Sequence, residues 1–256
     1  MNLAGAAFGI GCLTVALLVS LTYYVYTPTS LLVLMAVIPG FAAALFARAN
    51  FATPAQHPHR PLRAVWDEVK SPGAVLFSLI LFFQFGNEWS VAGWLAVFLV
   101  HQIGVRPDTA LGMLAFYWAA LFLGRVLTQA LLPAVGHSKL LLGSLMAALL
   151  GAIILSSTNN QFGAWMAILF LGGGFATIYP LVVEKIGHRF PDYHPGFFNG
   201  ILSFGITGGL LAPWCLGHMA DWWGIRTVML IPLLGTIMVF LLVVLLWIET
   251  RLVAGE

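Results

Sequence analysis

The chain has 256 residues, of which 61% are hydrophobic and 8% are charged, whereas soluble domains carry about 25% charged residues. This composition excludes a soluble enzyme, a disordered chain and a disulfide-stapled secreted domain, and it predicts an all-α, polytopic membrane protein. The net charge of +2 gives no indication of a nucleic-acid-binding surface.

Apolar runs separated by polar breaks predict about eight transmembrane helices. Each run is long enough to cross a bilayer, which requires roughly 20 apolar residues in a helix. Helices are expected rather than a β-barrel, because the runs do not alternate between polar and apolar residues. The expected spans are Leu3–Tyr23, Ser30–Ala47, Pro72–Val100, Thr109–Leu132, Leu140–Ser157, Gly163–Ile186, Gly196–Ala220 and Thr227–Ile248.

One long polar segment, Arg48–Ser71, divides the chain into unequal parts. Two spans lie in residues 1–47 and six lie in residues 72–256, so we expect two transmembrane regions joined by a cytoplasmic linker. His57 and His59 lie beside prolines in this segment, where a metal site is an alternative to a solvated linker. We favour the linker.

The distribution of Lys and Arg predicts the orientation. Cytoplasmic loops carry an excess of these residues. The loop set that includes the linker and both termini holds nine of them, whereas the opposite set holds two, Arg106 and Arg226. Both termini and the linker are therefore expected in the cytoplasm, with the protein in the plasma (inner) membrane. The nine residues are Arg48, Arg60, Arg63, Lys70, Arg125, Lys139, Lys185, Arg189 and Arg251.

Four stretches in the last six spans resemble the carboxyl-terminal half of a major facilitator superfamily transporter. They occur in the order and at the span spacing of the fucose/glucose permease-like branch. The stretches are FGNEWSVAGWL at Phe85–Leu95, GRVLTQALLPAVGHSKLL starting at Gly124, GGGFATIYP at Gly172–Pro180 and GHMADWWG at Gly217–Gly224.

This resemblance implies a major facilitator-like fold in which the first two spans correspond to helices five and six. Helices one to four of that fold then have no counterpart in the chain. Because the family's substrate cavity lies between two six-helix repeats, the chain holds one complete repeat and part of the other. We therefore expect a partial chain, or one that needs a partner chain or self-association; Gly5 and Gly9 offer a small-residue face for such contact.

Glu88 is the leading candidate for chemistry, because it lies near the middle of a predicted span. An ionised carboxylate in hydrocarbon is costly, so it is expected to face a cavity or a partner. Gln84, Asn87 and Glu88 lie at i, i+3 and i+4 and are expected to share one helix face. That face is suited to sugar hydroxyls and Glu88 to proton exchange; a structural hydrogen bond between helices is the alternative. Arg125 is expected near the cytoplasmic edge, too far away to pair with Glu88.

Three further residues are candidates for solute binding. Trp94 can stack on a sugar or belong to an interfacial aromatic belt. Tyr179 lies within the Gly172–Pro180 stretch, where glycines before a proline predict either a broken, cavity-lining helix or close helix packing. Asn199 begins a polar stripe near a cytoplasmic helix end.

These features predict a secondary active transporter that takes up a sugar or a similar small polar solute. The resemblance implies proton coupling and alternating access around a midplane site. The alternative is a non-transporting membrane subunit or an inactive part of a transporter. No cofactor or metal is expected, and an enzyme is disfavoured because only Glu88 is clearly deep in a span.

The orientation predicts which positions react with an impermeant reagent. In a chain with Cys12→Ala and Cys215→Ala, a cysteine placed at His57 is expected to resist an external, membrane-impermeant maleimide in intact cells. A cysteine at Asn159 is expected to react, because it follows a span that ends outside. Labelling at position 57 before the cells are opened would reverse the orientation.

Overall fold

The computed structural model describes residues 3–49, 69–190 and 195–254, and every regular element in these ranges is a helix. Within them, seven helices are long and apolar enough to span a membrane, and Phe8–Thr22 of α1 forms a shorter apolar helix. The elements are α1 (Leu3–Thr22), α2 (Pro28–Ala47), α4 (Pro72–Phe98) with the π-helical turn η1 (Leu99–Ile103), α5 (Pro107–Val135), α6 (His137–Ser157), α7 (Gln161–Arg189), α8 (Pro195–Trp223), the 3₁₀ turn η2 (Ile225–Met229) and α9 (Leu230–Ala254). The all-α fold class is thus confirmed, and a helix lies at each of the eight predicted spans.

The helix ends follow from local sequence. The Ser71 side chain accepts a hydrogen bond from the Ala74 amide at 3.4 Å, and Pro72 occupies the first helical turn of α4. Asn160 caps α7 in the same way, accepting from the Gly163 amide at 2.8 Å. Gly136 separates α5 from α6 with a φ of 83°, a backbone conformation that favours glycine. These signals place the turns between consecutive spans.

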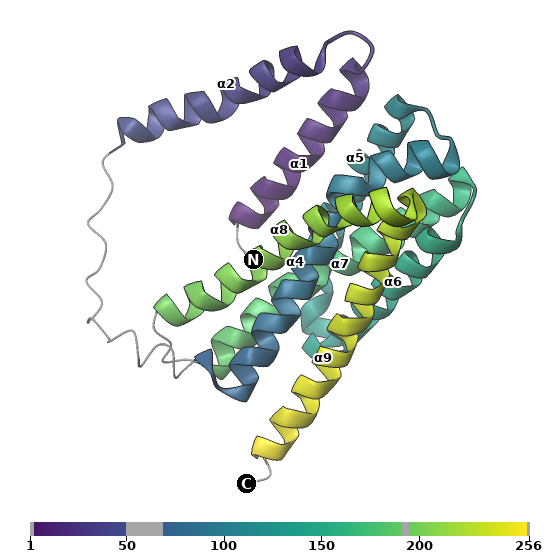
Figure 1. Ribbon diagram of the computed structural model, residues 1–256. Coiled ribbons are helices and arrows are strands. Elements are labelled where there is room, and N and C mark those ends of the chain that lie inside the picture. The colour runs from purple at the N-terminus through teal and green to yellow at the C-terminus, as the bar shows by residue number, and fades with distance from the viewer. Residues whose placement is uncertain (1–2, 50–68, 191–194, 255–256) are drawn as a thin grey trace.

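Helices α4 to α9 form one bundle, and α1 and α2 differ in how they relate to it (Figure 1). Helix α4 packs against α8 and α9, while α7 packs against α5 and α6. Helix α1 packs along α5, where the position of Gly9 faces the Phe122 ring. The expectation that this small-residue face is open to a partner is therefore wrong at Gly9, because α5 of the same chain covers it. Helix α2 stands apart and is almost entirely exposed.

Glycines set the closest helix contacts in the bundle. A Cβ at Gly172 would lie 2.7 Å from the Tyr117 carbonyl oxygen of α5, and one at Gly151 would lie 2.7 Å from the Leu171 amide of α7. A Cβ at Gly208 would overlap the backbone of Phe82 in α4. Small residues let membrane helices approach this closely, and at Gly172 the contact agrees with the close-packing alternative, since α7 runs unbroken through this stretch.

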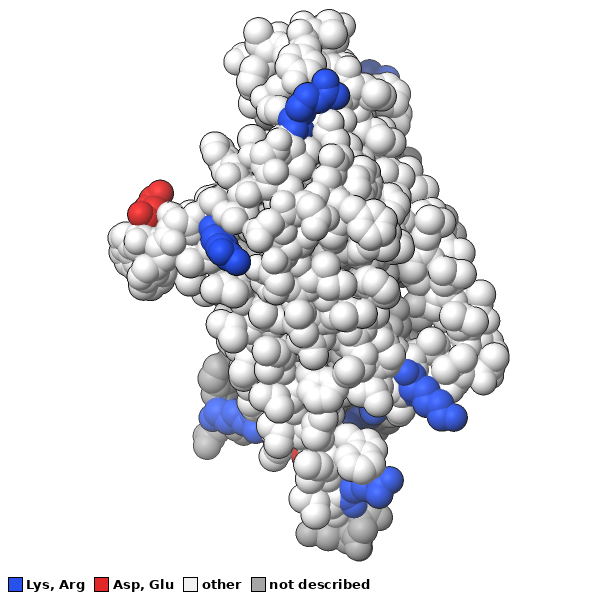
Figure 2. Space-filling view, turned by 90° about the vertical axis from the view of Figure 1, so that its right-hand side faces the viewer, with Lys and Arg blue, Asp and Glu red and all other residues white. Residues whose placement is uncertain are grey.

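Charged side chains are few, and some tie the helix ends together. Figure 2 shows a broad uncharged belt across the middle of one face, as a bilayer-spanning surface requires. At the predicted cytoplasmic end, Arg189 of α7 contacts Glu249 of α9 at 2.6 Å and donates to Thr250 at 3.2 Å. At the opposite end, the Ser20 hydroxyl of α1 donates to the Asp108 carbonyl of α5 at 2.8 Å.

The glycine contacts predict a pair of contrasting alanine substitutions. At Gly174, a Cβ would lie 2.5 Å from the Ala148 amide nitrogen, whereas at Gly173 no atom lies within 4 Å of that position. Gly174→Ala is expected to lower the free energy of unfolding by about 1–3 kcal/mol through overpacking. Gly173→Ala is expected to be neutral or to stabilise by up to about 1 kcal/mol, because alanine favours helix. Thermal unfolding of both variants in detergent tests this; equal melting temperatures would contradict it.

Candidate functional site

Glu88 lies on α4 inside the bundle, where only 7% of its surface is exposed. One turn earlier, Gln84 is also buried, and its Nε2 donates to Glu88 Oε1 at 2.8 Å. The Gln84 Oε1 atom has no hydrogen-bond partner among the described residues. The pair therefore presents a carboxylate and an unused amide acceptor in a region away from water.

Arg125 of α5 supplies the cation for this carboxylate. Its Nη2 atom lies 3.9 Å from Glu88 Oε2, and the Arg125 side chain is as buried as that of Glu88. The prediction that Arg125 is too far away was wrong. Helix α5 continues to Val135, ten residues beyond Arg125, and at 1.5 Å per residue this places Arg125 about 15 Å from the helix end. It thus lies deep in the span.

The ion pair borders a pocket with a volume of about 480 Å³, which we call the Glu88 pocket. Aromatic side chains from four helices surround the charged groups, and α8 closes the far side with aliphatic residues and a glycine. Trp89 is 44% exposed and is one of the residues that line this space. The pocket is lined by Phe8, Phe85, Glu88, Trp89, Trp118, Arg125, Tyr179, Leu202, Ile206, Gly209 and Leu210.

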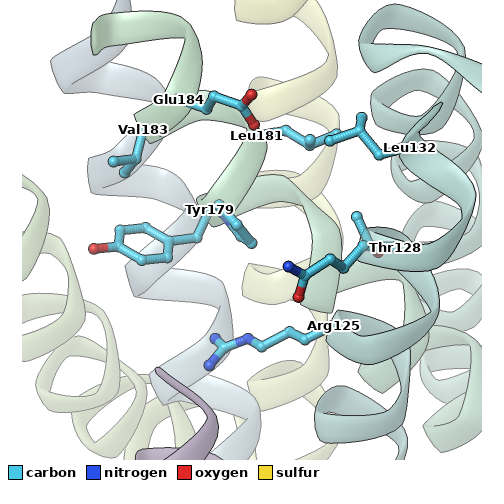
Figure 3. Close-up of a pocket in the computed structure, with 9 residues that line it drawn as sticks. Arg125, Thr128, Leu132, Tyr179, Leu181, Val183 and Glu184 are labelled. Atoms are coloured by element: carbon cyan, nitrogen blue, oxygen red, sulfur yellow. The ribbon is translucent and has the colours of Figure 1, made fainter. Parts of the chain in front are cut away.

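Tyr179 also lines a second pocket of about 420 Å³, which we call the Glu184 pocket. Figure 3 shows Arg125 at one end of it, Glu184 at the other and Tyr179 between them. The Phe85 ring packs on Tyr179 with ring centroids 5.2 Å apart. The lining residues are Arg125, Thr128, Gln129, Leu132, Tyr179, Pro180, Leu181, Val183 and Glu184.

The other predicted site residues lie elsewhere. Asn87 is directed to α9, where its Nδ2 lies 3.4 Å from Thr236 Oγ1, so it does not share the face of Gln84 and Glu88. Trp94 donates from Nε1 to the Pro213 carbonyl of α8 at 3.1 Å. Asn199 is exposed in the first turns of α8 and lines neither pocket.

Sequence reasoning missed several pocket residues. Two of them are Trp89 and Trp118. A signal for Arg125 was present, since the predicted span Thr109–Leu132 already places this residue well inside its end. Trp89 and Trp118 both pack against the Phe8 ring of α1, with ring centroids 6.3 and 6.1 Å apart, and contacts between distant helices leave no local sequence pattern.

No part of the chain that the structure describes brings together three or more His, Cys, Asp or Glu side chains that could hold a metal ion. His57 and His59, the residues for which a metal site was weighed, lie outside these ranges.

Comparisons with known proteins give relatives that the chain matches over only part of their length. A glucose/galactose transporter from Brucella abortus is 27% identical over 165 residues, which cover 62% of this chain and 39% of that protein. The multidrug resistance protein MdtG from Klebsiella pneumoniae is 33% identical over 137 residues, which cover 50% of this chain and 32% of that protein. The chain thus spans about two fifths or less of the length of these relatives.

A comparison with solved structures also finds a transporter that the chain matches over part of its length. The crystal structure of FucP, a major facilitator superfamily transporter in the outward conformation, matches with a TM-score of 0.63 and 19% identity. The match covers 85% of this chain and 54% of FucP. The sequence pattern of the Major Facilitator Superfamily matches residues 1–209. With its seven long apolar helices, the chain is an integral, multi-pass membrane protein that belongs to the major facilitator superfamily, a family of transporters rather than enzymes.

Proposed function

We propose that the chain forms the solute-binding side of a secondary active transporter that takes up a sugar or a similar small polar solute with protons. The observation that carries this proposal is the buried pair of Glu88 and Arg125 in the wall of an aromatic-lined pocket, with Gln84 hydrogen-bonded to Glu88. Intramembrane charges of this kind mark substrate or ion pathways. The proposed binding residues are Gln84, Glu88, Arg125, Trp89 and Tyr179.

The chemistry of the Glu88 pocket fits a sugar. Hydroxyl groups can donate to Glu88 and accept from Arg125, while the C–H face of a sugar ring can lie on an indole. Trp89 supplies such an exposed aromatic face beside the carboxylate. The glucose/galactose transporter relative supports the same solute class.

Glu88 is the proposed proton carrier. At 3.9 Å, its contact with Arg125 is longer than a direct charge-assisted hydrogen bond of about 2.8 Å. The pair can therefore open without breaking a short bond. When ionised, Glu88 pairs with Arg125; when it carries a proton, that attraction is lost and α4 and α5 are free to separate. Protonation is thereby linked to helix position, as alternating access requires.

A second candidate, transport of an apolar solute, is favoured by two observations. Most of the Glu88 pocket wall is aromatic or aliphatic, and the MdtG relative is a multidrug resistance protein. We prefer the polar solute, because a buried carboxylate and guanidinium would lose their hydration without replacement if an apolar solute filled the pocket.

The proposal is tested in right-side-out vesicles from native cells with the intact gene and from cells that lack it. An inward proton gradient is expected to drive accumulation of radiolabelled D-glucose or D-galactose only in the first, and a protonophore is expected to abolish it. Accumulation of an apolar cation instead would support the second candidate. Equal solute uptake in both vesicle types would support a non-transporting subunit.

Glu88→Gln is expected to separate binding from coupling. The amide keeps the shape and hydrogen-bonding reach of the side chain but cannot carry the proton. Proton-driven accumulation should fail, while counterflow exchange partly survives; Glu88→Ala should lose both. The matched control is Glu249→Gln, since Glu249 pairs with Arg189 at a helix end and lines neither pocket. A Glu88→Gln protein that accumulates solute like the parent would assign Glu88 to packing.

The ion pair also predicts a rescue. Arg125→Met is expected to lower the free energy of unfolding by about 3–5 kcal/mol, because it leaves a buried carboxylate without its cation. Adding Glu88→Gln should recover most of that loss. Arg106→Gln is the control: Arg106 contacts Asp108 at 3.2 Å but is 76% exposed, so its loss should cost about 1 kcal/mol or less. Thermal unfolding in detergent measures all four proteins; a double variant no more stable than Arg125→Met would exclude a functional pairing of the two charges.

A further inference from the structure

The Glu88 pocket and the Glu184 pocket meet at two shared residues, Arg125 and Tyr179. Arg125 is more than nine-tenths buried, and Tyr179 is held in place by the Phe85 ring at 5.2 Å. The two side chains therefore form a partition with a cavity on each side.

The Glu184 pocket has the polar groups that a sugar needs. Arg125, Thr128, Gln129 and Leu132 lie at i, i+3, i+4 and i+7 and so share one face of α5, and Tyr179 and Glu184 face them from α7. Guanidinium, amide, hydroxyl and carboxylate groups are thus gathered around a volume of about 420 Å³. This wall is more polar in composition than that of the Glu88 pocket.

The Glu184 pocket lies toward the predicted cytoplasmic end of the bundle. Leu132 and Glu184 lie in the last turns of α5 and α7, the ends that meet at the predicted cytoplasmic loops. Glu184 Oε2 lies 2.8 Å from His137 Nε2 at the start of α6, so the carboxylate is anchored at the mouth. The Glu88 pocket lies deeper, beyond Arg125 and Tyr179.

We infer that the Glu184 pocket is a second solute subsite, on the cytoplasmic side of the Arg125–Tyr179 partition, that holds the sugar before release. This inference rests on the proposed function. The subsite offers hydrogen bonds but one aromatic wall, Tyr179, whereas the Glu88 pocket has several. It therefore binds the sugar more weakly, as a release-side site must.

The test uses cysteine protection in native membranes, in a chain with Cys12→Ala and Cys215→Ala. Single cysteines replace Gln129 in the Glu184 pocket, Ile206 in the Glu88 pocket, or Gln161, an exposed residue at the far end of α7 that serves as the control. Alkylation by N-ethylmaleimide is measured against D-glucose concentration, with L-glucose as the stereochemical control.

D-glucose is expected to slow alkylation at positions 129 and 206 but not at 161. Half-protection at 129 should need about tenfold more sugar than at 206, the equivalent of roughly 1.4 kcal/mol of lost contacts. Glu88→Gln should weaken protection at 206 much more than at 129, since Glu88 lines only the Glu88 pocket and reaches the Glu184 pocket solely through Arg125.

Two results would overturn the second subsite while leaving the proposed function intact. One is protection at 206 with none at 129. The other is protection at both positions with the same dependence on D-glucose concentration, which Glu88→Gln shifts by the same amount at each. That result describes a single site. Protection at neither position would contradict sugar binding itself, and the second subsite with it.

Discussion

A buried carboxylate constrains much of this bundle. Glu88 cannot lie ionised among apolar helices without compensation, because removing a charge from water costs several kcal/mol. Gln84 supplies one hydrogen bond from the same helix, and Arg125 supplies a cation from the next. The two groups come from α4 and α5, so the charge balance of the interior depends on the distance between these helices. A change in that distance directly alters the electrostatic stabilisation of the Glu88 carboxylate.

The close packing of α8 on α4 determines which side chains reach the pocket. At Gly208 the backbone of Phe82 leaves no room for a Cβ, and at Gly209 a Cβ would lie 2.7 Å from Trp89 Cδ1. Because α8 presents glycines here, the Trp89 indole lies against the α8 backbone and its exposed face borders the Glu88 pocket. Larger residues would push the ring away from the carboxylate. The glycines thus shape the site without contacting a solute.

The spans were predictable because they depend on local properties. Twenty or more consecutive apolar residues, a capping Ser71 or Asn160 and a turn glycine such as Gly136 are visible in the sequence. The site was only partly predictable. Glu88 and Gln84 were identified from depth and spacing, and Tyr179 from its glycine- and proline-containing stretch. Asn87, however, turns to Thr236 and Trp94 to Pro213 because of how α8 and α9 pack. Such contacts join residues more than a hundred positions apart, which periodicity cannot reveal.

The length of α4 has a mechanical consequence. With η1 it forms 32 continuous residues, Pro72–Ile103, or about 48 Å of helix at 1.5 Å per residue, against a hydrocarbon core of about 30 Å. A helix this long accommodates the membrane by tilting. Glu88 lies at the midpoint of this helix, and when a helix tilts about its midpoint, that point hardly changes its depth in the bilayer. A change in the tilt of α4 about its midpoint therefore moves Ser71 and Gly104, at its two ends, much farther than Glu88, whose carboxylate stays at a nearly constant depth in the membrane.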